Sequence, residues 1–472
     1  MSKFDVSFEL LETPVKGEMF KFDAHGDPLP PDNPIVCLIE GDGIGRTING
    51  VPGITETSVR VLDAAVAKAY GGKRKIEWFN IHAGDAARET YFPHVTDAEL
   101  KGLPPQRQRD NYLPQDTLTA LDYFKVALKG PLTTPIGGGF SSINVALRQI
   151  FDLYVCLRPI KHFAGVPAPN INAHKVDMHL FRENSEDVYM GVEEIAGSER
   201  AQRIINLLNE ELDYKNRLAN PIRLSSGIGI KPVSPEGTKR LVRRAIKYAI
   251  ALGLPSVTLV HKGNIMKFTE GAFKNWGYEV LKDEFRDKII TEDELWDKNA
   301  GDLRGGAAPG KTGGRILVKD RIADSMFQQI QLRPDEYSVL ATPNLNGDYL
   351  SDALAALVGG LGLAPGANIG DGAAIFEATH GTAPKYTGID KANPGSIILS
   401  GMLMLNWMGW VEAGKLVEDA IAATVSESAD TAAKGAGQKL YVTYDIARQF
   451  EGYGEKDGAK ASEFGERIVR NM

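Results

Sequence analysis

The chain has 472 residues, of which 43% are hydrophobic and 24% are charged, a composition typical of soluble folded proteins with two or three domains. Its formal net charge of −7 provides no broad positive surface, so we expect it to bind neither nucleic acid nor an anionic membrane. Its two cysteines, Cys37 and Cys156, lie in apolar runs without a metal-binding spacing, which indicates buried thiols in a reducing cytoplasm.

The longest apolar runs, residues 353–364 and 397–411, are shorter than the roughly 18–20 residues that a membrane-spanning helix needs. We therefore expect both to form buried core helices. The N-terminus has no signal-peptide core because Asp5, Glu9 and Glu12 interrupt it early. These features again predict a cytoplasmic protein.

Residues 35–39 predict a buried strand, followed by the glycine-rich segment Gly41-Asp-Gly-Ile-Gly45. The third glycine comes one residue too early for the dinucleotide-binding fingerprint, so we predict a glycine loop without a Rossmann fold. A stripe of apolar residues over 59–69 then has the period of a helix.

Further along, residues 85–116 show no clear period and are interpreted as a surface excursion. Residues 187–233 form a separate small element with a charged helix over 198–212. Ser234 and Pro235 open a helix that Gly253 closes, and short strands follow over 257–260, 316–318 and 339–341. The alternation of helices and strands predicts an α/β protein.

Two carboxylates lie four residues apart in the segment 344–352. If a helix begins at Asp348, then Asp348 and Asp352 project from the same face, where oxygen ligands suit Mg²⁺. A third acid, Asp324, lies upstream at the end of another strand. On the spacing alone, a simpler interpretation is favoured, in which Asp348 caps the helix and Asp352 is solvated.

A second group of polar residues suits an anionic substrate. A helix N-terminus after three glycines and two strand-like runs carry groups that bind carboxylates, and a set of three arginines would suit a di- or tricarboxylate. The alternative is that each arginine pairs with a local acid. The residues are Ser142, Asn144, Arg148, Arg158 and Arg182.

Three other places have the chemistry of a site. Lys262 ends a buried strand and could act as a base, or it is simply a solvated lysine. The small residues of 380–386 would let backbone N–H groups approach a phosphate. Tyr444 and Arg448 would share one helix face, which is also true of an ordinary helix pair.

Together these motifs carry a resemblance that runs nearly from end to end. The chain resembles the β-decarboxylating dehydrogenases and, within them, the bacterial dimeric type of NADP-dependent isocitrate dehydrogenase. The most specific motifs are residues 129–135 (KGPLTTP), 144–149 (NVALRQ), 181–187 (FRENSED), 260–271 (VHKGNIMKFTEG), 344–349 (NLNGDY) and 377–386 (EATHGTAPKY).

The resemblance implies the isocitrate/isopropylmalate dehydrogenase fold, which has no Rossmann domain. It implies a large domain from residues 1–153 and 359–472, a small domain from 154–186 and 234–358, and a clasp over 187–233 that interlocks two subunits of a homodimer. The implied reaction is the oxidative decarboxylation of isocitrate to 2-oxoglutarate and CO₂ with reduction of NADP⁺, in the tricarboxylic acid cycle, with Mg²⁺ or Mn²⁺ bound.

The resemblance also assigns roles to residues. Tyr189 matches the tyrosine that protonates the enol carbon, and Lys262 matches the lysine that helps to take the hydroxyl proton in the partner's site. The metal ligands would be Asp324, Asp348 and Asp352, one of them reaching across the dimer. The isocitrate-binding positions would be Ser142, Asn144, Arg148, Arg158 and Arg182.

Ser142 also matches a serine that a kinase phosphorylates in some members, where a phosphate would repel the tricarboxylate.

NADP carries a ribose phosphate of charge roughly −2, which needs cations and hydroxyls. Lys385, Tyr386, Tyr444 and Arg448 match its four contacts, and NAD-using relatives have an acidic and an apolar residue at the first two. The other matching coenzyme positions are Thr133, His380, Gly381, Thr382, Ala383, Pro384 and Asn393.

Residues 88–112 and 428–440 look longer than in typical members of the family. Two alternatives stay open. One is a sister dehydrogenase acting on isopropylmalate, homoisocitrate or tartrate, although Ser142 and Asn144 are too polar for the alkyl group of the first. The other is a binding protein that has lost its catalysis, against which the retained Lys262 and Tyr189 argue.

Overall fold

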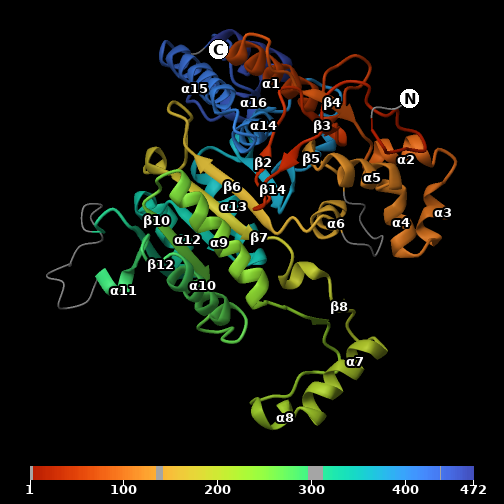
Figure 1. The fold of residues 1–472 in the computed structure, drawn as a ribbon, viewed down its shortest axis with the longest axis vertical. Coiled ribbons are helices and arrows are strands. Elements are labelled where there is room, and N and C mark those ends of the chain that lie inside the picture. The colour runs from red at the N-terminus through yellow and green to blue at the C-terminus, as the bar shows by residue number, and fades with distance from the viewer. Residues whose placement is uncertain (1–3, 134–141, 296–311, 436) are drawn as a thin grey trace.

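A mixed sheet runs through the body of the protein (Figure 1). The computed structural model describes residues 4–133, 142–295, 312–435 and 437–472, and in these residues the sheet has eleven strands. In spatial order they are β11 (Ile289–Thr291), β12 (Ile316–Ile322), β10 (Ser256–His261), β13 (Val339–Thr342), β7 (Asp177–Glu183), β6 (Val155–Lys161), β14 (Pro365–Gly370), β15 (Ala373–Ala378), β5 (Val126–Lys129), β3 (Ile35–Ile39) and β4 (Glu77–Asn80).

The sheet consists of two parallel blocks that run in opposite directions. Strands β11, β12, β10, β13 and β7 are parallel, and so are β15, β5, β3 and β4. Antiparallel pairing of β7 with β6, β6 with β14 and β14 with β15 joins the blocks. This order confirms the α/β class and differs from the Rossmann order.

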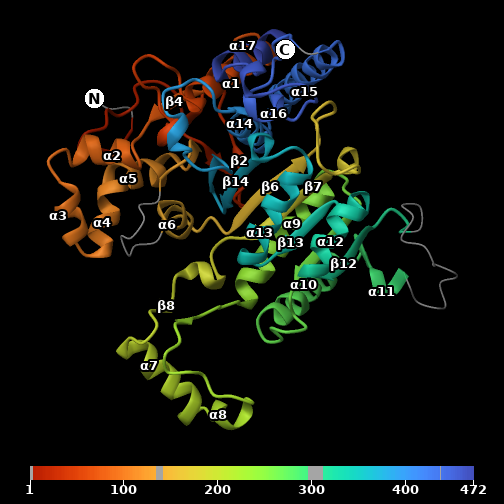
Figure 2. The same cartoon turned by 180° about the vertical axis from the view of Figure 1, so that it is seen from behind.

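Helices cover both faces of the sheet. Figures 1 and 2 show α9 (Pro235–Ala251) and α10 (Glu270–Glu284) on one face of the first block, with α12 (Ala323–Leu332) and α13 (Asn344–Leu357) on the other. The remaining helices are α1 (Ile54–Tyr70), α2 (Asp85–Tyr91), α3 (Asp97–Gly102), α4 (Pro105–Tyr112), α5 (Gln115–Phe124), α6 (Ile143–Ile150), α7 (Glu199–Asn206), α8 (Tyr214–Arg217), α11 (Glu292–Leu295), α14 (Gly395–Trp407), α15 (Val411–Ala433), α16 (Tyr444–Ala447) and α17 (Ala461–Asn471).

Helix α9 begins and ends where the sequence indicates. The Ser234 hydroxyl accepts a hydrogen bond from the Gly237 N–H at 3.0 Å, and Pro235 occupies the first helical position. Beyond the helix the chain turns at Gly253, whose φ of 64° favours glycine. The predicted helix is confirmed.

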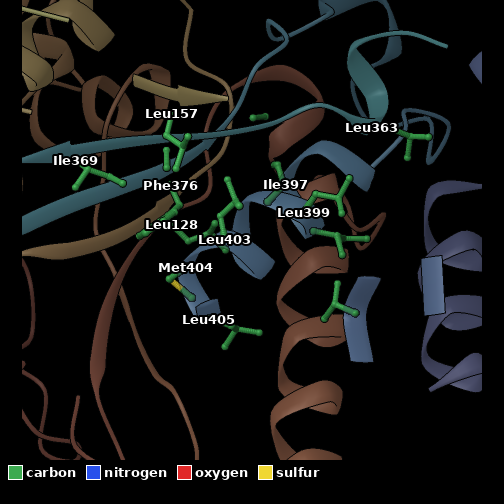
Figure 3. Packing of buried hydrophobic residues seen from close by; sticks show 14 of the residues in the cluster. Leu128, Leu157, Leu363, Ile369, Phe376, Ile397, Leu399, Leu403, Met404 and Leu405 are labelled. Atoms are coloured by element: carbon green, nitrogen blue, oxygen red, sulfur yellow. The ribbon is translucent and has the colours of Figure 1, made fainter. Parts of the chain in front are cut away.

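The largest core lies around α14, which is apolar on nearly all sides and is therefore buried. Figure 3 shows Leu403 and Met404 of this helix beside Leu128 and Phe376 of the sheet. The prediction of a single helix over 397–411 is wrong at the C-terminal end of that range. The chain turns at Gly409, with φ of 77°, before α15 begins.

One other prediction also needs correction. The apolar run 353–364 does not stay helical, because α13 ends at Leu357 and Gly359 and Gly360 adopt positive φ values of 107° and 119°. Residues 85–116, which are interpreted from the sequence as a surface excursion, are largely helical. They form α2, α3, α4 and the start of α5, helices too short to show a period, and they bury Leu100 and Leu113 against the core.

Residues 187–233 form an arm that extends away from the body (Figures 1 and 2). A short antiparallel pair, β8 (Glu193–Glu194) with β9 (Ile228–Gly229), leads to α7 and α8. The predicted helix over 198–212 ends early, since a wider π-turn follows Asn206. The arm exposes large apolar side chains, namely Val188, Met190, Val192, Ile195, Leu207, Leu212, Tyr214, Leu218, Leu224 and Ile230.

A small hairpin of β1 (Lys21–Phe22) and β2 (Pro28–Leu29) completes the strands among the described residues. Within this described part of the chain, no helix has both the length and the apolar character needed to cross a membrane.

Candidate active site

The carboxyl ends of the first parallel block bring several predicted residues to one edge of the sheet. Arg182 lies near the end of β7, in register with Thr342 of β13. Lys262 directly follows β10, Asp324 follows β12, and α13 begins just after β13. Ligand sites in open α/β sheets collect at such edges, and this edge is where we place the candidate active site.

Arg182 is the buried centre of the first group, with 1% of its surface exposed. Its Nε donates to the Asn344 side chain at 2.8 Å, and Nη1 donates to Asp348. The Tyr189 hydroxyl donates to the other oxygen of Asp348 at 2.8 Å, and its ring lies 4.8 Å from the guanidinium carbon of Arg182. Gly347 permits this packing, because a Cβ there would lie 2.6 Å from Arg182.

Asp348 and Asp352 lie one turn apart on α13, as their spacing predicts. However, the helix begins at Asn344, so Asp348 is not its cap. The two acids also have cationic partners from distant strands: Asp348 pairs with Arg182, and Asp352 lies 3.6 Å from Arg158.

The protonation of these two acids differs. Burial acts to raise the pKa of Asp348, but the charge of Arg182 and the hydrogen bond from Tyr189 outweigh it and hold that pKa low. Burial raises the pKa of Asp352, in spite of Arg158. Burial, together with the hydrogen bond to Asp348, also raises the pKa of the Tyr189 hydroxyl, which therefore stays protonated at neutral pH.

A second group lies deeper, where α6 meets the sheet. Arg148 and Lys129 both pair with the buried carboxylate of Glu377, at 2.9 and 2.8 Å. Asn368 donates to the same carboxylate at 2.7 Å. Ser142 directly precedes α6, and the three glycines predicted before it lie outside the described residues.

Three buried polar atoms near this group have no hydrogen-bond partner. They are the Nε of Arg148, the Nε of Arg158 and the side-chain oxygen of Asn144. Buried N–H groups are nearly always satisfied, so unpaired ones point to an acceptor that binds there. Two unpaired guanidinium N–H groups are donors of the kind that a polycarboxylate requires, whereas the Asn144 oxygen is an acceptor.

Lys262 and Asp324 form a separate ion pair with each other. Next to them, Ile265 and Phe268 are 69% and 91% exposed. Among the residues that the structure describes, no group of three or more acids, histidines or cysteines is arranged to hold a metal ion. Asp348 and Asp352 thus lie on α13 with arginine partners, whereas Asp324 on α12 is paired with Lys262.

The predicted coenzyme residues gather around α16. The rings of Tyr386 and Tyr444 lie 5.1 Å apart. Lys385 Nζ lies 4.8 Å from the Tyr386 ring centre, and the guanidinium carbon of Arg448 lies 5.9 Å from that of Tyr444. The Asn393 side chain donates to Asp445 at 3.0 Å. The four predicted phosphate contacts are thus brought together.

The loop 380–386 is held by the glycine loop of residues 41–45. The Ile44 N–H donates to the Thr382 carbonyl at 3.1 Å, and a Cβ on Gly43 would lie 2.3 Å from that oxygen. Burial lowers the pKa of His380, whose Nε2 atom has no partner. The Thr133 N–H donates to the Asp42 carboxylate at 2.8 Å.

Several of these residues were not predicted from the sequence. Lys129 and Glu377 lie in the family motifs 129–135 and 377–386. Their presence in these motifs was a signal that they contribute to the site. Glu270 receives the backbone N–H of Lys262 and the Asn346 side chain, and it also lies in a quoted motif. Lys391, which lies near both tyrosine rings, was not found by any pattern.

The fold and the grouping of acids, arginines and a tyrosine at one edge of the sheet agree with a dehydrogenase of the decarboxylating class. The chain belongs to the isocitrate/isopropylmalate dehydrogenase family, whose sequence profile matches residues 97–449.

Among its relatives, a protein of Coxiella burnetii named as an NADP isocitrate dehydrogenase is 51% identical, over 99% of this chain and 98% of that protein. One of the same name from Archaeoglobus fulgidus is 49% identical over 99% of both. A crystal structure of an isocitrate dehydrogenase from Methylococcus capsulatus is similar with a TM-score of 0.67 and 30% identity, covering 93% of this chain and 99% of that one.

Proposed function

We propose that this protein is an NADP-dependent isocitrate dehydrogenase, which converts isocitrate and NADP⁺ into 2-oxoglutarate, CO₂ and NADPH with Mg²⁺ or Mn²⁺ bound. The observation that carries the proposal is the set of unpaired arginine N–H groups next to Asp348, Asp352 and Tyr189. Relatives with this name, 47% to 51% identical over nearly the whole chain, support it.

Arg148, Arg158 and Arg182 would bind the carboxylates of isocitrate, since a planar guanidinium matches a carboxylate. Ser142 and Asn144 would contact the carboxylate that distinguishes isocitrate from isopropylmalate. An alkyl group at that place could accept no hydrogen bond from the amide N–H groups of Asn144 or the hydroxyl of Ser142, which disfavours the sister substrate.

The donor set fits a hard divalent cation, because Asp348 and Asp352 present carboxylate oxygens on one helix face. We infer that Asp324 of the partner subunit completes the site. The coenzyme would accept the hydride from C2 of the substrate, and the cation would polarise the adjacent oxygen atoms as a Lewis acid.

The chain's own residues would move the protons. The partner's Lys262 would help to remove the hydroxyl proton as hydride leaves. Tyr189 would return a proton to the carbon that loses CO₂, a role that suits a hydroxyl whose raised pKa keeps it protonated.

We further propose a homodimer with shared active sites. The apolar residues that the arm exposes, together with Ile265 and Phe268 beside Lys262, would become buried against the second chain. Residues 187–233 would be the clasp. The large domain would comprise residues 1–153 and 359–472, and the small domain would comprise residues 154–186 and 234–358. The boundary between the two domains would lie where β6 pairs with β14.

The coenzyme site would use His380, Gly381, Thr382, Ala383, Pro384 and Asn393 for the adenosine and Thr133 near the nicotinamide. Lys385, Tyr386, Tyr444 and Arg448 would contact the 2′-phosphate.

Both cysteines are free and buried, which agrees with the reducing cytoplasm that we propose as the compartment.

Product analysis tests this function. With isocitrate, Mg²⁺ and NADP⁺, we expect equal amounts of 2-oxoglutarate, CO₂ and NADPH. A chelator should abolish the reaction and added Mn²⁺ or Mg²⁺ should restore it, because carboxylate ligands alone do not stabilise the developing charge. Turnover that persists in excess chelator would overturn the metal assignment.

Replacement of Ser142 by Asp tests the proposed phosphorylation site. A negative charge at the start of α6 should raise the KM for isocitrate by about tenfold or more through repulsion. The KM for NADP⁺ should change little, and Ser142→Ala should keep most of the activity. If Ser142→Asp binds isocitrate normally, this serine does not face the substrate.

A further inference from the structure

An additional ion pair lies at the proposed 2′-phosphate site. Lys391 Nζ lies 4.7 Å from the centre of the Tyr444 ring and 5.3 Å from that of Tyr386. The same nitrogen pairs with the Glu455 carboxylate at 2.7 Å. Lys391 therefore contacts both aromatic residues of the proposed phosphate site.

Glu455 is surrounded by the cations of that site. One of its oxygens accepts from Lys391, and the other lies 3.6 Å from Arg448. Its pKa is lowered, first by the hydrogen bond from Lys391, and then also by the charges of Arg448 and Lys385. One carboxylate thus interacts with three cations, two of which match phosphate contacts of the family.

This pair contributes little as a structural contact. The side chains of Lys391, Glu455 and Arg448 are 31%, 45% and 56% exposed, and ion pairs of this exposure stabilise a fold only slightly. A partly exposed cluster of three cations around one anion is instead suited to exchange that anion for another.

We propose that Lys391 is a fifth contact of the coenzyme 2′-phosphate, and that Glu455 is the resident anion which the phosphate displaces. The proposal rests on the proposed function, because it assumes that NADP binds at Lys385, Tyr386, Tyr444 and Arg448. It assigns specificity to two residues outside that set of four.

The charges explain why the carboxylate has to leave. A 2′-phosphate carries a charge of roughly −2 at neutral pH and would repel Glu455 if both used the same cations. Glu455 begins a single 3₁₀ turn, Glu455–Asp457, directly after Gly454. A side-chain rotation in this short turn would free Lys391 and Arg448 without moving α16.

The turn is connected to the segment that looks longer than in the family. The Leu440 N–H donates to the Asp457 carbonyl at 2.8 Å, and the Gly454 N–H donates to the Asp457 carboxylate at 2.7 Å. Leu440, the last residue of that segment, therefore helps to hold the turn that carries Glu455.

Calorimetric titration of the full-length protein with adenosine 2′,5′-bisphosphate tests the proposal, with kcat/KM for NAD⁺ as the second measurement. Lys391→Gln should weaken bisphosphate binding by about tenfold, since a charge-assisted bond is lost, while kcat/KM for NAD⁺ stays within about twofold. Lys391→Arg should restore most of the affinity. Lys415→Gln, which removes an exposed lysine paired with Asp419 on α15, is the matched control and should bind as the wild type does.

Glu455→Gln should tighten bisphosphate binding several-fold, because the competing charge is removed. Weaker or unchanged binding by Glu455→Gln would overturn the displacement. Unchanged binding by Lys391→Gln, or equal losses with the bisphosphate and NAD⁺, would overturn the fifth contact and leave the proposed function intact. If the wild type itself does not bind the bisphosphate, the proposed coenzyme and this inference both fail.

Discussion

Two variants that are each inactive, Lys262→Met and Tyr189→Phe, should regain activity when their subunits are exchanged. Each change alone should lower kcat by about 10²- to 10⁴-fold, the usual effect of losing a general acid or base. The KM for isocitrate should change little, because the three arginines that we expect to bind its carboxylates remain.

We expect this recovery because the proposed site takes its two proton-transfer groups from different chains. Tyr189 hydrogen-bonds to Asp348, whereas Lys262 pairs with Asp324. A mixed dimer would combine Tyr189 of one chain with Lys262 of the other in one intact site. Statistical exchange in a twofold dimer should restore about a quarter of the wild-type activity.

Initial rates after subunit exchange measure this effect, and each variant carried through the same exchange with itself is the control. A site contained in one chain would leave every mixed dimer inactive. Absence of recovery, with mixed dimers demonstrated by mass spectrometry, would therefore contradict the shared site.

The second large effect concerns stability. Glu377→Gln should lower the free energy of unfolding by about 3–5 kcal/mol at pH 7, because it leaves buried charges on Lys129 and Arg148 without a counter-ion. Urea denaturation measures the change. Glu466→Gln, an exposed acid 4.0 Å from Arg470, is the control and should have little effect.

The pH dependence of this difference has a defined sign. Burial acts to raise the pKa of Glu377, but Lys129 and Arg148 outweigh it and hold the pKa far below its usual value. The stability from this carboxylate is therefore present above the unfolded pKa of about 4.5 and is lost as the pH falls below it. If the difference in unfolding free energy between the wild type and Glu377→Gln became larger toward acid pH, this assignment would be contradicted.

Much of the fold could be predicted because its signals are local. The buried strands, the caps of α9 and the motifs of the family each occupy a short stretch, and the fold and family are confirmed. The errors came from effects that apolar content does not reveal. Two glycines with positive φ end the helix that was expected to reach residue 364, and a turn at Gly409 ends the helix that was expected to reach residue 411.

The site residues were predicted one by one, and their roles and the domain boundaries stay predictions. What the sequence could not provide is how the residues group. Arg182 with Asp348 and Lys129 with Glu377 are pairs formed between distant strands and helices, so no spacing reveals them. The different partners of the three acids, arginines for Asp348 and Asp352 and Lys262 for Asp324, also become visible only in three dimensions.

The most direct test of the proposed function is the absorbance of the reduced nicotinamide during reaction of the protein with isocitrate and Mg²⁺, supplied with NADP⁺ or NAD⁺. We expect rapid reduction of NADP⁺, much slower reduction of NAD⁺, and none with isopropylmalate in place of isocitrate. Faster reduction of NAD⁺ would contradict the phosphate site at Lys385, Tyr386, Tyr444 and Arg448. No reduction of either coenzyme with isocitrate would contradict the proposed function itself.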